Sequence, residues 1–469
     1  MTMKAVFLGH QSWVVETPSG GVYFDPVLKS SFGHSLHVQF PVFPPRRIDI
    51  ARMPRPLAVV ITHEHHDHFH LPSLMELRQH GATRALVGEL VPSFIGDLLV
   101  ELGFDVQTVR SGQRVLVSEV ELAAFQCDHM TARWEERAYQ WMVRHGSDLL
   151  FNAVDAHPSS AALIDVDVLR ATTLIVANNS QVPPNPKYNN LRSSGGESAE
   201  ARQARRAQLF RALVQLPTKL LPQVRQILIC GSGFLEPVQH FGAFLDSDNA
   251  ALGRVFSEVR ADLSIHGAVT GCSYDVGVLS TSAVDYVQVD SATERDQRQI
   301  GEAAVVSGAP LKPLRPVTSL AIRAADAEHT IVAELRVLKD LLLASTFGKV
   351  LVHSGHARPL VLRFVGEPDL QFAYEVRTGQ FVRIGALEVD LIDAFPYGIE
   401  LFQSDFRAVL EGHIQIWDLI NVASRSWSEA EHADSPNTFL FFVYGEHRRP
   451  DLTRDVIART LGVLDGHRP

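Results

Sequence analysis

The sequence has little cysteine, no long apolar run and no excess of basic residues. Its three cysteines, Cys127, Cys230 and Cys272, are too few for a disulfide framework and form no zinc or iron–sulfur motif. No apolar run approaches the roughly 18 residues that span a membrane, and the first residues lack a signal-peptide pattern. These absences predict a protein of the reducing cytoplasm with no membrane partner.

Acidic residues outnumber basic ones by 53 to 43, which gives a formal net charge of −10. A chain with this balance and no basic stripe is not expected to bind nucleic acid. The 469 residues are enough for two or three domains, or for one large domain with insertions. We expect a first domain over residues 1–290 and a second over 291–469. The choice between a monomer and a homodimer stays open.

The most informative stretch is Ile61–His70, in which five of ten residues are histidines and one is an aspartate. It follows the short apolar run Leu57–Ile61, which is typical of a buried strand, and a helical pattern begins at Leu71. The histidines therefore lie on a strand-to-helix loop, where functional sites are commonly built. Imidazole and carboxylate ligands together suit zinc, iron or manganese.

The spacing within this loop predicts two metal ions. His63 and His65 are two residues apart, so their side chains face the same way on an extended segment. Asp67 and His68 must then point toward a second ion. Two ions about 4 Å apart need a shared anionic ligand. Asp155 is the best candidate because it follows the apolar strand 149–152, where a buried carboxylate needs a partner.

Two further ligands are expected at the ends of other strands. Asp128 and His129 follow the strand 120–125, and either could bind a metal. His129 would give a histidine-rich site suited to zinc, whereas Asp128 would add a carboxylate and favour iron. The last ligand is His240 or His266, and we favour His240.

The order of strands and helices predicts an α/β fold, a four-layer αββα sandwich with a C-terminal β-rich α+β extension. A loop at 178–196, rich in Asn, Pro, Ser and Gly, is expected over the site or at the surface. The predicted strands of the sandwich are 4–8, 12–15, 22–24, 57–61, 84–87, 105–109, 113–117, 120–125, 139–143, 149–152, 174–177 and 226–230, and its predicted helices are 71–83, 91–103, 197–216 and 248–260. The extension is predicted to contain strands at 361–364, 371–376 and 381–384 and helices at 331–345 and 403–411.

The motif Thr62-His63-x-His65-x-Asp67-His68, with the later Asp155, resembles the metallo-β-lactamase superfamily over residues 4–275. The resemblance implies the αββα fold and a two-metal centre in which Asp155 bridges the ions. Most members of the superfamily are zinc hydrolases, and a smaller set are diiron oxygenases. The segment Phe125–His129, followed by a strand and Asp155, resembles the diiron β-hydroxylases of antibiotic biosynthesis.

The tail of the chain adds a second resemblance. Residues 416–419 and 424–427 are similar to the tail of CMP-N-acetylneuraminate hydroxylases, although the sequence has no motif for their Rieske cluster. In domain organisation the chain resembles the stand-alone diiron monooxygenases of platensimycin and platencin biosynthesis, whose substrate is a diterpenoid thioester.

Two classes of enzyme follow as hypotheses. The first is a monooxygenase with two Fe ions, which uses O2 to hydroxylate a bulky, mostly hydrophobic small molecule such as a terpenoid thioester. It needs an external electron donor or reductase, because the sequence has no flavin or iron–sulfur motif. The second is a hydrolase with two Zn ions, acting on a lactone, amide, thioester or phosphodiester. Asp155 and Asp67 are the expected catalytic residues in both, and a non-catalytic scaffold is a third hypothesis.

Overall fold

The structure is a computed structural model that describes residues 3–128, 137–179, 199–235, 248–278, 280–295, 314–318, 332–337, 340, 359–367, 371–375, 378, 380–385, 390–395, 397–428, 445 and 449–466. Contacts within the chain define two compact units. The first contains Met1–Gly33, Phe40–Pro184 and Glu197–Val305, and the second contains His34–Gln39, Asn185–Gly196 and Val306–Pro469. The expected assignment of function to residues 1–290 and 291–469 stays a prediction.

The first unit contains two large sheets, of eight and seven strands. The order in the first sheet is β18 (Thr281–Ala283), β17 (Cys272–Asp275), β1 (Lys4–Gly9), β2 (Ser12–Thr17), β3 (Gly20–Phe24), β7 (Pro56–Ile61), β8 (Arg84–Gly88) and β9 (Asp105–Val109). The order in the second is β10 (Arg114–Val117), β11 (Val120–Gln126), β12 (Tyr139–His145), β13 (Asp148–Asn152), β14 (Thr173–Ala177), β15 (Gln226–Cys230) and β16 (Ser264–Gly267).

The alternation of side chains along β11 shows why two sheets pack together. Leu122 and Ala124 join the core cluster that also contains Val15 and Val60 of the first sheet. Ala123 and Phe125 instead join the cluster that contains the helical residues of the second sheet's outer face. Because side chains alternate across a strand, both faces of the second sheet are apolar and both must be covered.

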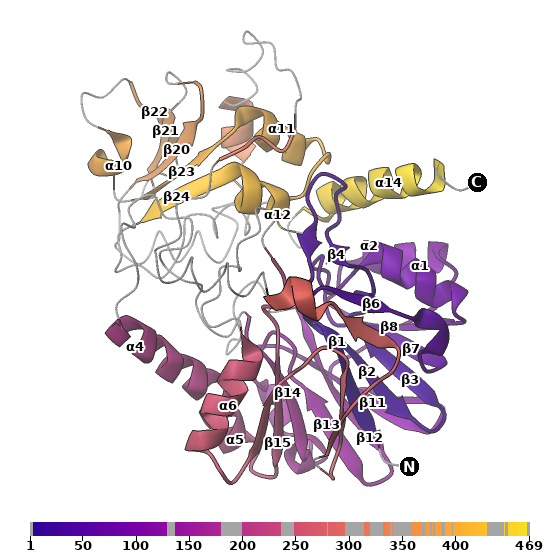
Figure 1. The fold of residues 1–469 in the computed structure, drawn as a ribbon. Coiled ribbons are helices and arrows are strands. Elements are labelled where there is room, and N and C mark those ends of the chain that lie inside the picture. The colour runs from indigo at the N-terminus through magenta and orange to yellow at the C-terminus, as the bar shows by residue number, and fades with distance from the viewer. Residues whose placement is uncertain are drawn as a thin grey trace. The chain divides into compact units, whose positions relative to one another are not determined.

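Helices cover the outer faces. Figure 1 shows α1 (Leu71–Gln79) and α2 (Ser93–Glu101) beside the first sheet, and α5 (Leu216–Leu220) and α6 (Asn249–Val259) beside the second. A longer helix, α4 (Ala199–Phe210), continues through a π-helical turn, Arg211–Gln215, into α5. The short α3 is Ser160–Leu163, and a 3-10 helix spans Val168–Arg170. The predicted four-layer αββα sandwich is confirmed.

Short elements complete the first unit. Two strand pairs, β4 (Ser31–Phe32) with β5 (Phe40–Pro41) and β6 (Arg46–Ile48) with β19 (Val287–Val289), occupy connections between the larger strands. A 3-10 helix follows at Ile50–Arg52. The guanidinium of Arg46 is buried and donates to the carbonyl oxygens of Leu8, Val27 and Lys29.

The second unit is built on a five-stranded sheet in the order β22 (Gln380–Arg383), β21 (Gln371–Glu375), β20 (Leu360–Phe364), β23 (Tyr397–Leu401) and β24 (Ser424–Ser428). Its helices are α10 (Leu391–Ala394), α11 (Gln403–Leu410), α12 (Ile416–Asp418), a π-helical turn at Leu419–Ala423 and α14 (Pro450–Gly466). Glu400 lies buried between Arg363 and Arg425, its neighbours on the adjacent strands. Its charge is therefore paired across three strands.

Two predicted segments lie largely outside the described residues. The predicted loop 178–196 is described only at Asn178 and Asn179, and most of it lies outside the described residues, as does most of the predicted helix 331–345. Among the residues that the structure describes, no helix is both long and apolar enough to cross a membrane.

Candidate metal centre

The histidine-rich loop begins directly after β7, and every residue from Thr62 to His70 is buried. Backbone hydrogen bonds from the N–H groups of His68 and Phe69 to the carbonyl of His65 close a tight turn within it. Burial of so many polar side chains is unfavourable unless they are paired or bind a metal. The burial of these polar side chains therefore points to a binding site at the loop.

Three side chains of this region present potential ligand atoms to one point. Those atoms, from His63, His68 and Asp155, all lie within 4.8 Å of one another, and all three residues are buried. His63 and His65 also converge, with Nε2 and Nδ1 3.0 Å apart. The His68 Nε2 atom lies 3.2 Å from Asp155 Oδ2 and 3.4 Å from Asp67 Oδ2.

These separations fit a metal site. Two donors that each lie about 2.1 Å from one tetrahedral ion are about 3.4 Å apart. The observed separations of 3.0, 3.2 and 3.4 Å differ little from that value. Three imidazoles and two carboxylates could thus accept ions after only small movements, and the donor chemistry suits zinc or iron.

The hydrogen bonds at the outer side of two rings aim their Nε2 atoms inward. Thr62 Oγ1 donates to Asp25 Oδ2 over 2.7 Å, so it can accept from His63 Nδ1, which lies 3.0 Å away. His68 Nδ1 donates to Asp25 Oδ2 over 2.8 Å. A histidine that donates from one nitrogen to a carboxylate or hydroxyl has its other nitrogen oriented for a metal.

The pKa values of the clustered residues shift in different directions. Burial lowers the pKa of His63 well below its ordinary value, and His68 and His65 add to the effect, so His63 is neutral. Burial would also lower the pKa of His68, but Asp67 and Asp25 outweigh it and raise that pKa well above the ordinary value. Burial would raise the pKa of Asp67, yet His68 and His10 hold it well below. Without metal, His68 is the cation among these carboxylates.

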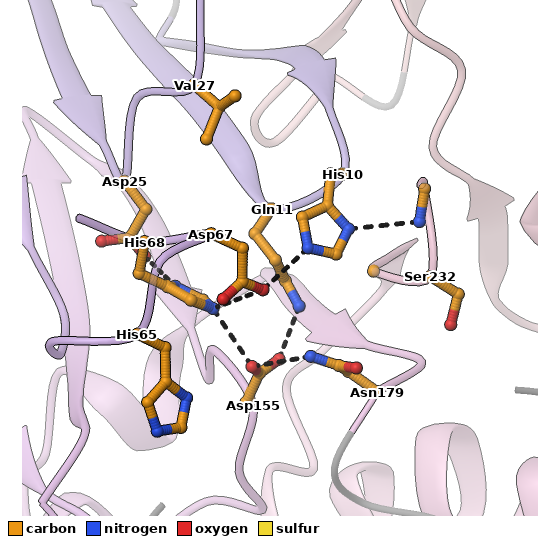
Figure 2. A network of polar contacts seen from close by, with 12 residues as sticks. His10, Gln11, Asp25, Val27, His65, Asp67, His68, Asp155, Asn179 and Ser232 are labelled. Atoms are coloured by element: carbon orange, nitrogen blue, oxygen red, sulfur yellow. Dashed lines mark hydrogen bonds and ion pairs between the residues drawn. The ribbon is translucent and has the colours of Figure 1, made fainter. Parts of the chain in front are cut away.

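Three residues that the sequence analysis missed support the carboxylates (Figure 2). His10 Nε2 donates to Asp67 Oδ2 over 2.8 Å. Gln11 Nε2 donates to Asp155 Oδ1 over 2.5 Å, and Asn179 Nδ2 donates to Asp155 Oδ2 over 2.9 Å. The available signal was positional: His10 and Gln11 interrupt two apolar strands, and Asn179 follows the buried strand β14.

Backbone strain concentrates around the same place. Among the described residues, five other than glycine have positive φ, and four of them surround the site: His10, Asp25, Val154 and Ser232. Val154, at φ 54°, is β-branched and directly precedes Asp155. Each such residue costs roughly 1–3 kcal/mol and persists only where its surroundings fix it. This strain supports a functional role for the cluster.

The other predicted ligands are not members of this three-residue group or are not described. Asp128 is not a member of the three-residue group, and its Oδ2 accepts a hydrogen bond from the N–H of Ser160 at the start of α3. His266 is half-buried on β16, where its Nε2 lies 2.7 Å from Ser264 Oγ. His129 and His240 lie outside the described residues. Both choices left open by the sequence remain predictions.

Glu64, between the converging His63 and His65, does not join them. It is buried and pairs with the guanidinium of Arg137. His66 is not a member of the three-residue group and packs against Phe32 and Phe40, with ring centroids 5.2 and 4.8 Å away. The loop therefore alternates between residues of the centre and residues that fix its shape.

Comparison with protein families finds a match to one part of the first unit. The family model described as the beta-lactamase superfamily domain matches residues 21–166. The chain carries a beta-lactamase superfamily domain. The predicted kinship is confirmed, and the matched segment includes His63, His65, Asp67, His68 and Asp155. His10 and Gln11 precede the matched segment.

Solved structures that match the chain include a hydroxylase and two hydrolases. CmlA, a diiron beta-hydroxylase from Streptomyces venezuelae, is 18% identical over 55% of this chain and 51% of its own, with a TM-score of 0.35. Igni18, a metallo hydrolase from Ignicoccus hospitalis, is 15% identical over 61% of this chain and 100% of its own, with a TM-score of 0.37. The isothiocyanate hydrolase from Delia radicum gut bacteria is 14% identical over 60% and 99%, with a TM-score of 0.38. No curated protein sequence matches the chain.

Proposed function

We propose that the protein is a metal-dependent enzyme with two ions at this beta-lactamase superfamily site. We propose further that it is a diiron monooxygenase, which hydroxylates a bulky, mostly hydrophobic small molecule such as a terpenoid thioester. The overall reaction is R–H + O2 + two electrons + two protons giving R–OH + H2O. An external donor or reductase supplies the electrons.

The observation that carries the proposal is the burial of five potential ligands in one place. The exposed fraction of these five residues ranges from 0% at His68 to 9% at Asp67. Charged side chains at this depth are ordinarily paired or coordinate metals. Here three imidazoles meet two carboxylates, so the cluster has the donors for ions and not only for internal pairs.

The contacts suggest how the ligands are shared. His63 and His65 converge and would hold one ion, while Asp67 and His68 would hold the other. Asp155 lies beside His68 and is fixed through both of its oxygens, which suits a carboxylate shared between two ions. When bound, two iron ions supply the redox chemistry that O2 activation requires.

An aromatic group beside the loop supports a hydrophobic environment. Phe32, Phe40 and Phe234 pack on one another, with ring centroids 5.5 to 6.0 Å apart. Phe32 stacks on His10, the residue that donates to Asp67, at 5.1 Å. Apolar side chains next to a reactive centre exclude water and limit side reactions. This surrounding favours oxidation of a hydrophobic substrate.

A dinuclear zinc hydrolase is the second candidate, and the position of Asp128 favours it. The oxygenase hypothesis gains most from Asp128 as a third carboxylate ligand, and one oxygen of this carboxylate, Oδ2, already accepts from the N–H of Ser160. Without Asp128, the described donor set contains more imidazoles than carboxylates, which suits zinc well. The ionised Asp67 would then orient the attacking water.

Metal content and O2 consumption decide between the two. The full chain would be produced once with iron and once with zinc, and each preparation analysed for metal and activity. The oxygenase proposal predicts about two iron ions per chain and O2 uptake that depends on a reductase and a terpenoid thioester. Stoichiometric zinc with thioester hydrolysis and no iron-dependent oxidation would overturn it. The variant Asp155→Ala is the matched control and should lose either activity.

A further inference from the structure

One turn of the chain contacts both carboxylates of the candidate metal centre. The turn joins β1 to β2, and its two central residues are His10 and Gln11. His10 donates to Asp67, and Gln11 donates to Asp155. We propose that the His10–Gln11 turn is a positioning device that sets the orientation of both metal-binding carboxylates. The inference rests on the proposed metal centre and adds residues that hold its ligands in place.

The hydrogen bonds of His10 define one tautomer. The N–H of Gly233 donates to His10 Nδ1 over 3.2 Å, so Nδ1 is an acceptor and carries no proton. The ring proton is therefore on Nε2, the atom that faces Asp67 Oδ2 at 2.8 Å. Asp67 accepts from a fixed donor on one side and keeps its remaining lone pairs for an ion.

Aromatic contacts hold the His10 ring in this orientation. Phe32 stacks on one face, with planes only 8° apart, and Phe234 meets the ring edge-on at 81°. The His10 residue itself has no exposed surface. A ring packed in this way cannot rotate to another hydrogen-bond partner without displacing its neighbours.

Gln11 is fixed at both ends of its amide. The thiol of Cys230 donates to Gln11 Oε1 over 3.3 Å, so the amide nitrogen must face Asp155. Gly231 lies against this amide, and a Cβ added at Gly231 would lie 3.2 Å from Gln11 Nε2. The end of β15 thus determines which way the Gln11 side chain presents its N–H donor.

The backbone of the turn is also held from the second sheet. His10 has a φ of 52°, and its carbonyl oxygen accepts from the N–H of Gly231 over 2.9 Å. The same segment, residues 230–233, therefore fixes the His10 backbone, the His10 ring and the Gln11 amide. Figure 2 shows His10 between Asp67 and this segment. Such multiple anchoring is what a strained positioning element requires.

The test compares metal binding by the full-length wild type with that of three variants. His10→Phe keeps a stacked ring but removes the donor, and His10→Gln returns an N–H donor of similar reach. Gln11→Met keeps the length and removes the amide. Co2+ is the probe, because its visible absorption reports both affinity and coordination geometry. His145→Phe, at the far end of β12, is the control.

Loss of a supporting contact typically weakens metal binding 10–100-fold. We expect that loss for His10→Phe at one of two Co2+ sites, with a changed absorption band. His10→Gln should restore the affinity to within a few-fold and the band to its wild-type position. Because Asp155 is shared, Gln11→Met should weaken both sites. His145→Phe should match the wild type.

The outcomes separate this inference from the proposed function. If the wild type binds no Co2+, the metal centre itself is refuted. If the wild type binds two ions and both His10→Phe and Gln11→Met match it in affinity and spectrum, only the role of the turn is refuted. Equal losses of Co2+ affinity in His10→Phe and His10→Gln would also refute it, because the affinity would then depend on the packing of the His10 ring and not on its N–H donor. Circular dichroism of the metal-free proteins identifies any variant that fails to fold, and the remaining variants then decide.

Discussion

Replacement of Asp25 by alanine tests how the loop is built. The Asp25 carboxylate accepts three hydrogen bonds, from the Thr62 N–H at 2.8 Å, the Thr62 hydroxyl at 2.7 Å and His68 Nδ1 at 2.8 Å. Burial raises the pKa of Asp25, although His68 and Thr62 oppose this rise. The side chain therefore connects the end of β3 to both ends of the turn that carries the candidate ligands.

The expected loss of stability follows from the hydrogen-bonding groups that Asp25→Ala leaves without their partner. A buried N–H without a partner costs about 1–3 kcal/mol, and removal of one partner from a buried ion pair costs about 3–5 kcal/mol. His68 keeps contacts with Asp67 and Asp155, so we expect a total loss of about 3–5 kcal/mol. Because a unit of this size shifts its melting midpoint by roughly 2 °C or less per kcal/mol, the midpoint should fall by up to about 10 °C. Metal affinity should fall about 10–100-fold because His68 loses its orientation.

Thermal unfolding of the metal-free protein and a Co2+ titration measure the two effects separately. Asp25→Asn, which keeps the shape and one acceptor oxygen, should lie between the wild type and Asp25→Ala in both. Asp262→Asn, at a surface ion pair with Arg260, is the matched control and should change neither. A melting midpoint and an affinity of Asp25→Ala equal to those of the wild type would refute the reasoning.

The remaining predictions concern protonation, the shared carboxylate and the second unit. Asp67 and Asp25 overcome the effect of burial and raise the pKa of His68, so a metal ion that binds His68 must displace the proton of its imidazolium. The metal affinity should therefore fall up to about tenfold for each pH unit below that pKa. Calorimetry of metal binding in two buffers should detect at least one released proton. No proton release at neutral pH would contradict this. Asp155→Ala should bind fewer ions than the wild type by elemental analysis, and unchanged stoichiometry would exclude a bridging role. Trp427 is fully buried and donates to the Phe395 carbonyl oxygen. Trp427→Ala should therefore lower the free energy of unfolding by about 3–5 kcal/mol in denaturant titrations. A change below 1 kcal/mol would contradict a role of Trp427 in the core of the second unit.

The sequence was most informative where local pattern and chemistry coincide. The apolar run before Thr62 predicted a buried strand with a ligand-rich loop at its end, and β7 ends at Ile61. The order of strands and helices predicted two sheets with outer helices, and the fold has them. These features depend on side-chain type and near neighbours, which a single sequence records.

The sequence was least informative where a role depends on distant segments. His10 and Gln11 look like an ordinary turn until residues 230–233 lie against them. Residues 34–39 join the second unit, where Thr460 Oγ1 donates to the His34 carbonyl oxygen, across 426 positions of sequence. Asp128 matched a ligand pattern and stays a predicted ligand, and the sequence did not show that its Oδ2 atom accepts from the N–H of Ser160. Hydrogen-bond partners of this kind are set by the tertiary fold.

The central claim is that His63, His65, Asp67, His68 and Asp155 together hold two metal ions. The most direct test is elemental analysis of the full-length wild type after loading with excess iron or zinc and removal of free metal, with protein concentration measured by amino-acid analysis. The account predicts two tightly bound ions per chain. One ion per chain, or none, would contradict it.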